Sequence, residues 1–250
     1  MVRITERDRE LLTFTADHRL VLAEHVEVLL GVPHAAATTR LRALVRAGML
    51  TRRSLFDRQP PCYQITRSGL AVAGSRLATP RLDLRAYDHD VGLAWLWLAA
   101  RAGSFGALTE IVSERQLRSR DAARERGQPA LAVRLGGVGP RGHERLHYPD
   151  LLLRTASGHR VAVELELTGK GRTRREKILA GYASDPRIDA VLYLVERKSV
   201  GLAIAASASR LGLSRLVHVQ LVARRERGRG AGASRAVQRA AGVCAETAAR

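Results

Sequence analysis

The chain has 250 residues, with 42 lysines and arginines against 24 aspartates and glutamates, which gives a formal net charge of +18. Hydrophobic residues make up 46 %, a normal share for a globular protein, so the composition excludes wholesale disorder. No run of ~18 apolar residues could span a membrane, and the charged N-terminus, MVRITERDRELL, lacks the apolar core of a signal peptide. We therefore expect a cytoplasmic protein with no membrane partner, whose two cysteines, Cys62 and Cys244, form neither a disulfide framework nor a zinc site.

Arginine carries almost all of the positive charge, since the only lysines are Lys170, Lys177 and Lys198. A GC-rich genome would explain arginine in place of lysine, but it would not explain the excess of basic over acidic residues. Arginines neutralise phosphates and release counterions, so the charge favours a nucleic-acid partner. Residues 224–250 are rich in Ala, Gly and Arg without an apolar period. We expect them to form a disordered basic tail that adds non-specific affinity for phosphates.

The first 80 residues begin with two predicted helices. Thr5 has the character of an N-cap, and Asp8 stands at the third helical position, as in a capping box. A second apolar run starts at Leu20, continues to Leu30 and stops at Gly31.

A third helix and a hairpin follow. Apolar residues spaced by three or four predict a helix over 34–47, which Gly48 ends. Two extended stretches, 49–56 and 62–66, flank a turn at 57–61 and predict a basic hairpin.

Three helices followed by a basic hairpin, with the run TTRLRALVRAGMLTRR and then YQITRSGLAVA, resemble the winged helix-turn-helix of bacterial regulators. In that family the third helix enters the major groove and the hairpin contacts the backbone. The resemblance implies double-stranded DNA as the partner, because hydroxyls and guanidinium groups reach base edges and phosphates. A solvated face or a protein-binding module remains the alternative. The implied DNA contacts are Thr38, Thr39, Arg40 and Arg42 on the helix and Arg52, Arg53 and Arg58 on the hairpin.

The rest of the chain alternates helices and strands after a linker at 80–85. This order predicts a three-layer α/β arrangement in which the strand over 188–196 is buried on both faces. The predicted elements are a helix over 87–103, a strand passing into a helix over 108–118, a loop over 121–145, strands over 147–155 and 160–168, a helix over 171–184, a strand over 188–196, a helix over 198–212 and a strand over 216–222.

An acidic cluster is the strongest chemical signal in this region. Glu164 and Glu166 lie two residues apart in a strand and so share one face, and an antiparallel partner strand would bring Asp150 toward them. Converging carboxylates repel one another unless a cation neutralises them, and oxygen ligands suit Mg²⁺ or Mn²⁺. Such an ion would activate water and screen a phosphate, while Lys170 or Lys177 would stabilise developing negative charge.

Two simpler interpretations stand beside the acidic site. Glu164 and Glu166 could lie on a solvated face, paired to Arg172 or Arg174. The histidines of the preceding Arg- and Gly-rich segment, His143 and His147, are expected to be ordinary polar residues.

Pro149-Asp150, thirteen intervening residues and the ELE run at 164–166 resemble the PD-(D/E)xK nuclease superfamily. More specifically, the chain resembles the replication-relaxation family of mobile-element proteins, which joins a winged helix to a restriction-endonuclease-like domain. The segments that carry this resemblance are 87–94, 113–119, 147–153, 161–174 and, more weakly, 190–195.

The resemblance implies that Asp150 and Glu164 are metal ligands and that Glu166 and Lys170 complete a catalytic site with Mg²⁺ or Mn²⁺. An early helix would supply a further acid, which is either Asp90 or Glu114. Glu166 departs from the superfamily, which usually has lysine at that position. Lys170 or Lys177 would then have to replace the missing lysine.

These observations predict three segments: a winged helix over 1–80, a nuclease-like α/β domain over 81–223 and the tail over 224–250. We expect a DNA-binding protein of a plasmid or mobile element that acts in replication or relaxation. Two roles for the second domain stay open. It could be a metal-dependent endonuclease that nicks DNA. It could instead be a non-catalytic adaptor, or the sensor of a transcriptional regulator. Other replication or transfer proteins and a second copy of the chain are further candidate partners.

Overall fold

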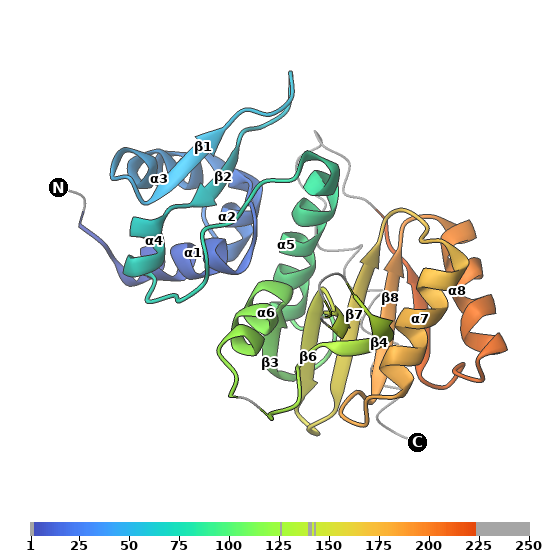
Figure 1. Ribbon diagram of the computed structural model, residues 1–250. Helices are drawn as coiled ribbons and strands as arrows, with labels where there is room; N and C mark the ends of the chain where they lie inside the picture. Colours follow the sequence, from blue (N-terminus) through green and yellow to red (C-terminus); the bar gives the residue numbers. More distant parts are fainter. Residues whose placement is uncertain (1–2, 126, 140–141, 143, 224–250) are drawn as a thin grey trace. The chain divides into compact units, whose positions relative to one another are not determined.

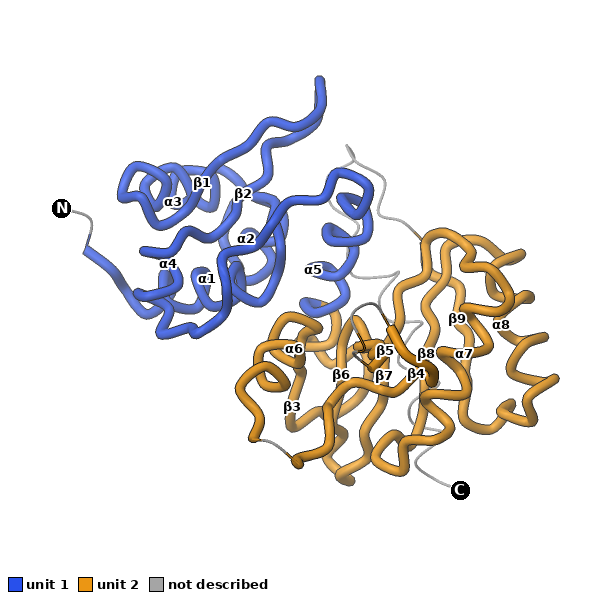
Figure 2. The backbone as a smooth tube through the Cα atoms, in the orientation of Figure 1, with its two compact units in different colours: residues 1–98 blue, residues 99–250 orange. Residues whose placement is uncertain are grey.

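The computed structural model in Figure 1 describes residues 3–125, 127–139, 142 and 144–223. The chain divides into two compact units, Met1–Leu98 and Ala99–Arg250 (Figure 2). The division falls inside helix α5 (Tyr87–Arg101), later than the boundary expected at residue 80. The basic tail expected over 224–250 lies outside the described residues.

The first helix of unit 1, α1 (Glu6–Asp17), begins with the predicted capping box. The Asp8 amide donates to the Thr5 hydroxyl at 3.3 Å, and the Thr5 amide donates to the Asp8 carboxylate at 2.7 Å. Two of the helix's unpaired amide groups are satisfied in this way, which fixes where the helix starts.

Helix α2 (Ala23–Leu30) ends at Gly31, as predicted, and Gly31 adopts a left-handed conformation with φ of 61°. The helix begins later than the apolar run from Leu20 suggested. Val21 instead forms an isolated antiparallel bridge with Tyr63, through backbone hydrogen bonds of 2.8 and 2.9 Å. The start of this apolar run is therefore not helical, because Val21 pairs with a distant residue.

Helix α3 (His34–Arg46) and the antiparallel strands β1 (Leu50–Arg53) and β2 (Cys62–Ile65) confirm the predicted third helix and hairpin. A short helix that the sequence did not predict, α4 (Arg67–Val72), follows the hairpin. It packs so closely that a Cβ atom on Gly69 would lie 2.2 Å from the Met49 carbonyl oxygen.

The core of unit 1 joins these elements to α5. Leu41 and Leu44 of α3 are fully buried in the same cluster as Ala94 and Leu98 of α5. Burying such aliphatic side chains contributes about 1.5–3 kcal/mol each. This shared core explains why unit 1 extends to Leu98 and does not end at the linker.

Unit 2 is built on a five-stranded mixed sheet in the order β3-β6-β7-β8-β9. The first three strands pair antiparallel, and β7, β8 and β9 pair parallel. The strands are β3 (Leu108–Ser113), β6 (Leu151–Thr155), β7 (Arg160–Glu166), β8 (Ala190–Val195) and β9 (Val217–Leu221).

Helices α7 (Arg172–Ala183) and α8 (Lys198–Arg210) follow β7 and β8 and pack on one face of the parallel part of the sheet (Figure 1). Helix α6 (Glu114–Ala122) follows β3, as the sequence suggested. The hairpin of β6 and β7 and the buried strand β8 confirm the predicted strands of this region.

The prediction of a loop over 121–145 is wrong for the second half of this segment. Strands β4 (Val133–Val138) and β5 (Glu144–His147) form a separate antiparallel pair. Val133 is buried against α7, where a Cβ atom on Gly181 would lie 2.8 Å from the Arg134 carbonyl oxygen. The Gly-rich sequence gives no alternating apolar pattern for these strands, because Val133 is their one buried residue.

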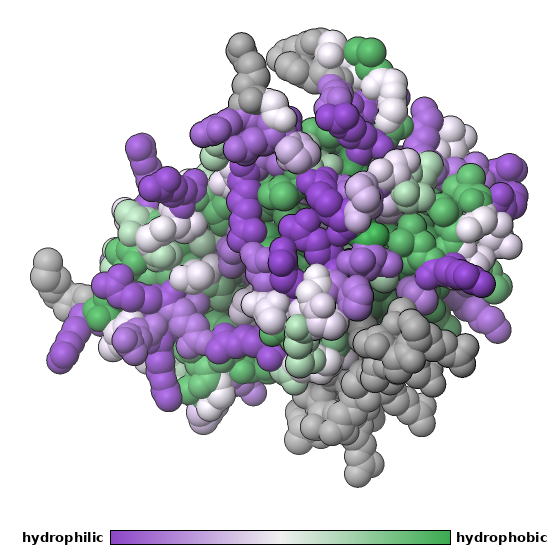
Figure 3. All heavy atoms as spheres, turned by 90° about the horizontal axis from the view of Figure 1, so that it is seen from below, coloured by the Kyte–Doolittle hydropathy of each residue, from purple (hydrophilic) through white to green (hydrophobic). Residues whose placement is uncertain are grey.

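The described residues therefore form a mixed α+β protein with eight α-helices, a five-stranded sheet and two small two-stranded sheets. On the face drawn in Figure 3, hydrophilic side chains are spread widely, with smaller hydrophobic patches between them. Among the helices in the described ranges, none is long and apolar enough to cross a membrane.

Candidate functional site

The hairpin of β6 and β7 brings Asp150 beside Glu164. Leu151 is paired with Val163, so Asp150 and Glu164 come next in the register, and the Leu165 amide donates to the Asp150 carboxylate at 2.8 Å. Glu164 and Glu166 share one face of β7, as predicted. Both are buried, with exposed fractions of 2 % and 5 %. The alternative of a solvated acidic face is therefore wrong.

Glu164 has two protein donors from other elements. His147, at the end of β5, places its Nε2 atom 2.6 Å from one Glu164 oxygen, and the Tyr182 hydroxyl of α7 donates to the same oxygen. The His147 and Tyr182 rings meet edge to face, with centroids 5.8 Å apart. Burial raises the pKa of Tyr182 well above its usual value, and the negative charge of Glu164 adds to this shift. The hydroxyl therefore keeps its proton and remains a donor.

The sequence missed both of these partners of Glu164. His147 follows an Arg- and Gly-rich segment, which predicts an ordinary polar residue. Tyr182 lies on a helix with no chemical motif around it. The available signal was the position of Tyr182 on the apolar side of α7, next to Ile178 and Leu179. That pattern predicts that Tyr182 is a core residue, but it does not predict the hydrogen bond to Glu164.

Glu166 is paired with Lys170, whose ammonium group bonds its carboxylate. Burial raises the pKa of Glu166, the Lys170 hydrogen bond lowers it, and the nearby carboxylates of Glu164 and Asp150 raise it further, so that the net shift is upward. Lys170 is thus the ion-pair partner of the buried Glu166 carboxylate. Lys177 lies exposed on α7.

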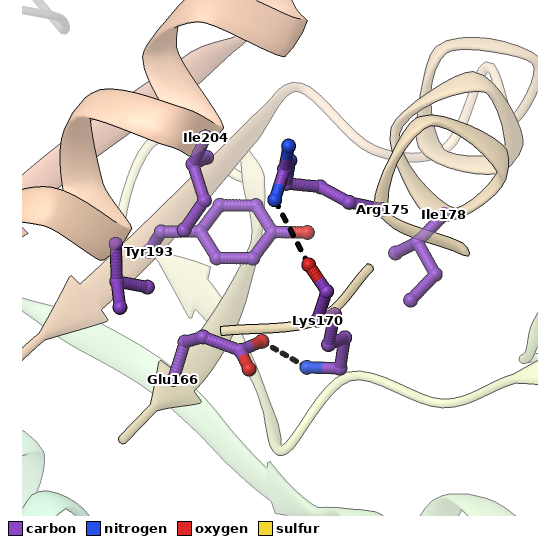
Figure 4. A pocket seen from close by; sticks show the side chains of 7 residues that line it. Glu166, Lys170, Arg175, Ile178, Tyr193 and Ile204 are labelled. Atoms are coloured by element: carbon purple, nitrogen blue, oxygen red, sulfur yellow. Dashed lines mark hydrogen bonds and ion pairs between the residues drawn. The ribbon is translucent and has the colours of Figure 1, made fainter. Parts of the chain in front are cut away.

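A small pocket adjoins this ion pair on the face covered by α7 and α8 (Figure 4). Arg175 is held there by two hydrogen bonds, from Nη1 to the Lys170 carbonyl oxygen at 3.0 Å and from Nε to the Ser207 hydroxyl at 2.9 Å. The pocket is lined by Glu166, Lys170, Arg175, Ile178, Tyr193, Val200 and Ile204.

Protein donors hold one oxygen of each glutamate. His147 and Tyr182 bond the same oxygen of Glu164, and Lys170 bonds one oxygen of Glu166. Within the described ranges, no three His, Cys, Asp or Glu side chains are grouped to hold a metal ion.

The two candidates for a further acid have partners in their own units. Asp90, in unit 1, accepts from Arg19 at 3.3 Å. Glu114, in unit 2, accepts from Arg118 at 2.8 Å.

The residues predicted to contact DNA lie on α3 and the hairpin of unit 1. Thr38 and Arg40 are half-buried, and the Thr38 hydroxyl oxygen has no hydrogen-bond partner among the described residues. Arg58, in the loop between β1 and β2, pairs loosely with Asp57 at 3.7 Å. The fully exposed members are Thr39, Arg42, Arg52, Arg53 and Arg58.

Arg40 has a structural role that the sequence did not reveal. Its guanidinium donates two hydrogen bonds to the carboxylate of Asp8, a residue only 2 % exposed, and a third to the Arg3 carbonyl oxygen at 3.1 Å. Burial works to raise the pKa of Asp8, but the hydrogen bonds from Arg40 and Thr5 outweigh it and lower the pKa. Arg40 therefore ties α3 to α1.

Compared with known proteins, the chain matches no family model, no curated protein and no solved structure.

Proposed function

We propose that unit 1 binds double-stranded DNA as a winged helix-turn-helix, with α3 in the major groove and the β1–β2 hairpin against the backbone. The observation that carries this proposal is the charge of one continuous segment. Residues 34–56 contain five arginines and no aspartate or glutamate. Four of these arginines are exposed: Arg42, Arg46, Arg52 and Arg53.

The packing of α3 supports this orientation. Ala37, Leu41 and Leu44 are buried in the core, so the opposite side of the helix carries Thr39 and Arg42 to solvent. A helix that presents hydroxyl and guanidinium groups can donate to both base edges and phosphates.

The experiment is a titration of fluorescent duplex DNA with charge-removal variants of the full chain. R42Q/R46Q on α3 and R52Q/R53Q on the hairpin should each weaken binding by about tenfold or more at low salt, because each loses two phosphate-neutralising charges. R67Q/R76Q is the matched control, since it removes two exposed arginines from another part of the same unit. Equal affinities in all three double variants would contradict the proposal.

The wider role proposed for the chain follows from its resemblance to replication-relaxation proteins: it would act at a DNA site of a plasmid or mobile element. Under this proposal unit 1 selects the DNA and unit 2 acts there, or recruits a replication or transfer protein.

A second candidate function, hydrolysis of a phosphodiester, is favoured by one observation in unit 2. Asp150 and Glu164 are neighbours across β6 and β7, and the Lys170 ammonium bonds Glu166 beside them. The metal ion stays a prediction, because His147, Tyr182 and Lys170 hold the two glutamates of the cluster.

Supercoiled plasmid tests this candidate. Nicking that requires Mg²⁺ or Mn²⁺, stops with EDTA and is lost in D150N but not in D189N would support hydrolysis. Retarded migration without nicking would favour a non-catalytic adaptor or regulator.

A further inference from the structure

The turn between β7 and α7 has a sequence suited to bind an anion. Residues 167–171 read LTGKG, and they lead from the carboxyl end of a parallel strand directly into a helix of 12 residues. The N-cap of α7 is Gly171, which makes no side-chain capping bond, so the first amide groups of the helix keep their hydrogen-bonding capacity. These amides and the helix dipole favour negative charge at this end.

A second helix begins at the same edge of the sheet. Helix α8, of 13 residues, follows the carboxyl end of β8, and its N-cap, Arg197, likewise makes no side-chain capping bond. Because β7 and β8 are parallel neighbours, α7 and α8 both direct the positive ends of their dipoles toward this edge. Residues of both helices line the same pocket: Arg175 and Ile178 from α7, and Val200 and Ile204 from α8.

Tyr193 provides an independent sign that the pocket takes a ligand. The residue is only 2 % exposed, yet no described residue forms a hydrogen bond with its hydroxyl. Figure 4 shows this hydroxyl directed into the pocket, toward Arg175. The hydroxyl lines the pocket and can donate a hydrogen bond, so it would bind an acceptor that enters the pocket.

Arg175 is positioned to complete the binding group. Its Nε and Nη1 atoms are engaged by Ser207 and Lys170, which hold the guanidinium in place and leave Nη2 without a hydrogen bond among the described residues. The charged groups lining the pocket are Arg175, Lys170 and Glu166, which sum to one positive charge. The carboxylates of Glu164 and Asp150 also act on Tyr193. Further exposed cations surround this edge: Arg172, Arg174, Arg197 and Lys198.

We infer that this pocket binds a phosphate group, with one oxygen bound by the Tyr193 hydroxyl and Arg175 Nη2 and the others facing the first turn of α7. The pocket has room for about one water-sized atom, which fits a single phosphate oxygen inside and the rest of the group at the mouth. The inference does not depend on DNA binding by unit 1, because it concerns other residues in the other unit.

Pyrophosphate is the probe, and amide NMR spectra of the full chain are the readout. Addition of pyrophosphate at millimolar concentration should shift the amide resonances of residues 172–174 and 198–200. No shift at these residues, or shifts confined to α3 and the β1–β2 hairpin, would overturn the inference.

Two variants with matched controls test the assigned side chains. R175Q should weaken pyrophosphate binding about tenfold or more, and Y193F by about threefold to tenfold, as expected for a charged and a neutral hydrogen bond. R120Q on α6 and Y63F on β2 are the controls, and both should bind as the wild type does. If R175Q does not fold, the pyrophosphate affinity of Y193F tests the pocket by itself, since this variant removes one oxygen and keeps the buried ring. Unchanged binding in Y193F would contradict the assigned pocket.

The source of the phosphate is identified by competition against pyrophosphate. A mononucleotide that competes as well as an oligonucleotide of the same terminal base would identify a free nucleotide as the ligand. Stronger competition by the oligonucleotide, abolished in R175Q, would identify a nucleic-acid phosphate. Failure of both to compete, with pyrophosphate still bound, would identify a free inorganic phosphate as the ligand.

Discussion

Arg40 on α3 holds the buried carboxylate of Asp8 on α1 through two hydrogen bonds from its guanidinium. Asp8 also closes the capping box of α1, so a single carboxylate caps α1 and anchors α3. The helix proposed to enter DNA is therefore anchored by an ion pair on the side opposite its exposed arginines.

Removing the Arg40 side chain should destabilise unit 1. In R40A the Asp8 carboxylate would stay buried without its cation, and we expect the free energy of unfolding to fall by about 1–3 kcal/mol. The upper values that apply to fully buried pairs are not expected, because the Arg40 side chain is 32 % exposed. Urea denaturation measures the change. R42A is the control and should stay within about 0.5 kcal/mol of the wild type, since Arg42 is exposed. Equal stability of R40A and R42A would contradict the structural role of Arg40.

The same ion pair predicts a dependence on acid pH. The pKa of Asp8 is lower in the folded chain than its ordinary value of 3.8, so the folded state releases this proton more readily than the unfolded state. The stabilisation is fully present above the unfolded pKa and is lost as the pH falls through the folded pKa. The stability of the D8N variant should therefore change less between neutral and strongly acid pH than that of the wild type. Parallel pH profiles of the two proteins would show that Asp8 contributes nothing.

Two buried tyrosines on one face of unit 2 should respond differently to removal of their hydroxyls. The Tyr182 hydroxyl bonds the buried Glu164 carboxylate, so Y182F should lower the free energy of unfolding by about 1–3 kcal/mol. The Tyr193 hydroxyl has no hydrogen bond among the described residues, so Y193F should change stability by less than about 0.5 kcal/mol. Thermal denaturation of both variants measures the difference. A larger decrease in Y193F than in Y182F would contradict the hydrogen bonding described.

Lys170 should compete with a divalent cation for Glu166. Its ammonium occupies the carboxylate, so the wild type should gain little thermal stability from Mn²⁺. The K170A variant frees that oxygen and removes a positive charge, and it should gain more, because a ligand that binds only the folded state raises its stability. K177A is the matched control, since Lys177 is exposed on the following helix. Equal Mn²⁺ shifts in K170A and K177A would show that Lys170 does not block a cation.

Local signals in the sequence predicted many of the elements. Thr5 and Asp8 are three residues apart at a helix start, and Gly31 follows an apolar run, so the physical cause of each boundary lies within a few residues. The shared face of Glu164 and Glu166 follows from the two-residue period of a strand. These predictions needed no knowledge of distant contacts.

Interactions between distant segments explain what the sequence did not reveal. Val21 leaves the α2 helix because it pairs with Tyr63, and Arg40 turns to Asp8, 32 residues earlier. His147 reaches Glu164 only because β5 and β7 are brought together by the fold. In each case the partner is chosen by tertiary packing, which residue spacing does not encode.

Salt dependence of duplex DNA binding tests the central claim most directly. If unit 1 neutralises phosphates through its exposed arginines, the logarithm of the association constant should fall linearly with the logarithm of salt concentration. R52Q/R53Q should then reduce the slope by roughly 0.9 for each phosphate that is no longer neutralised, while R67Q/R76Q should leave the slope unchanged. A slope that is the same in both variants, or DNA binding that does not depend on salt, would contradict the claim that α3 and the hairpin bind DNA.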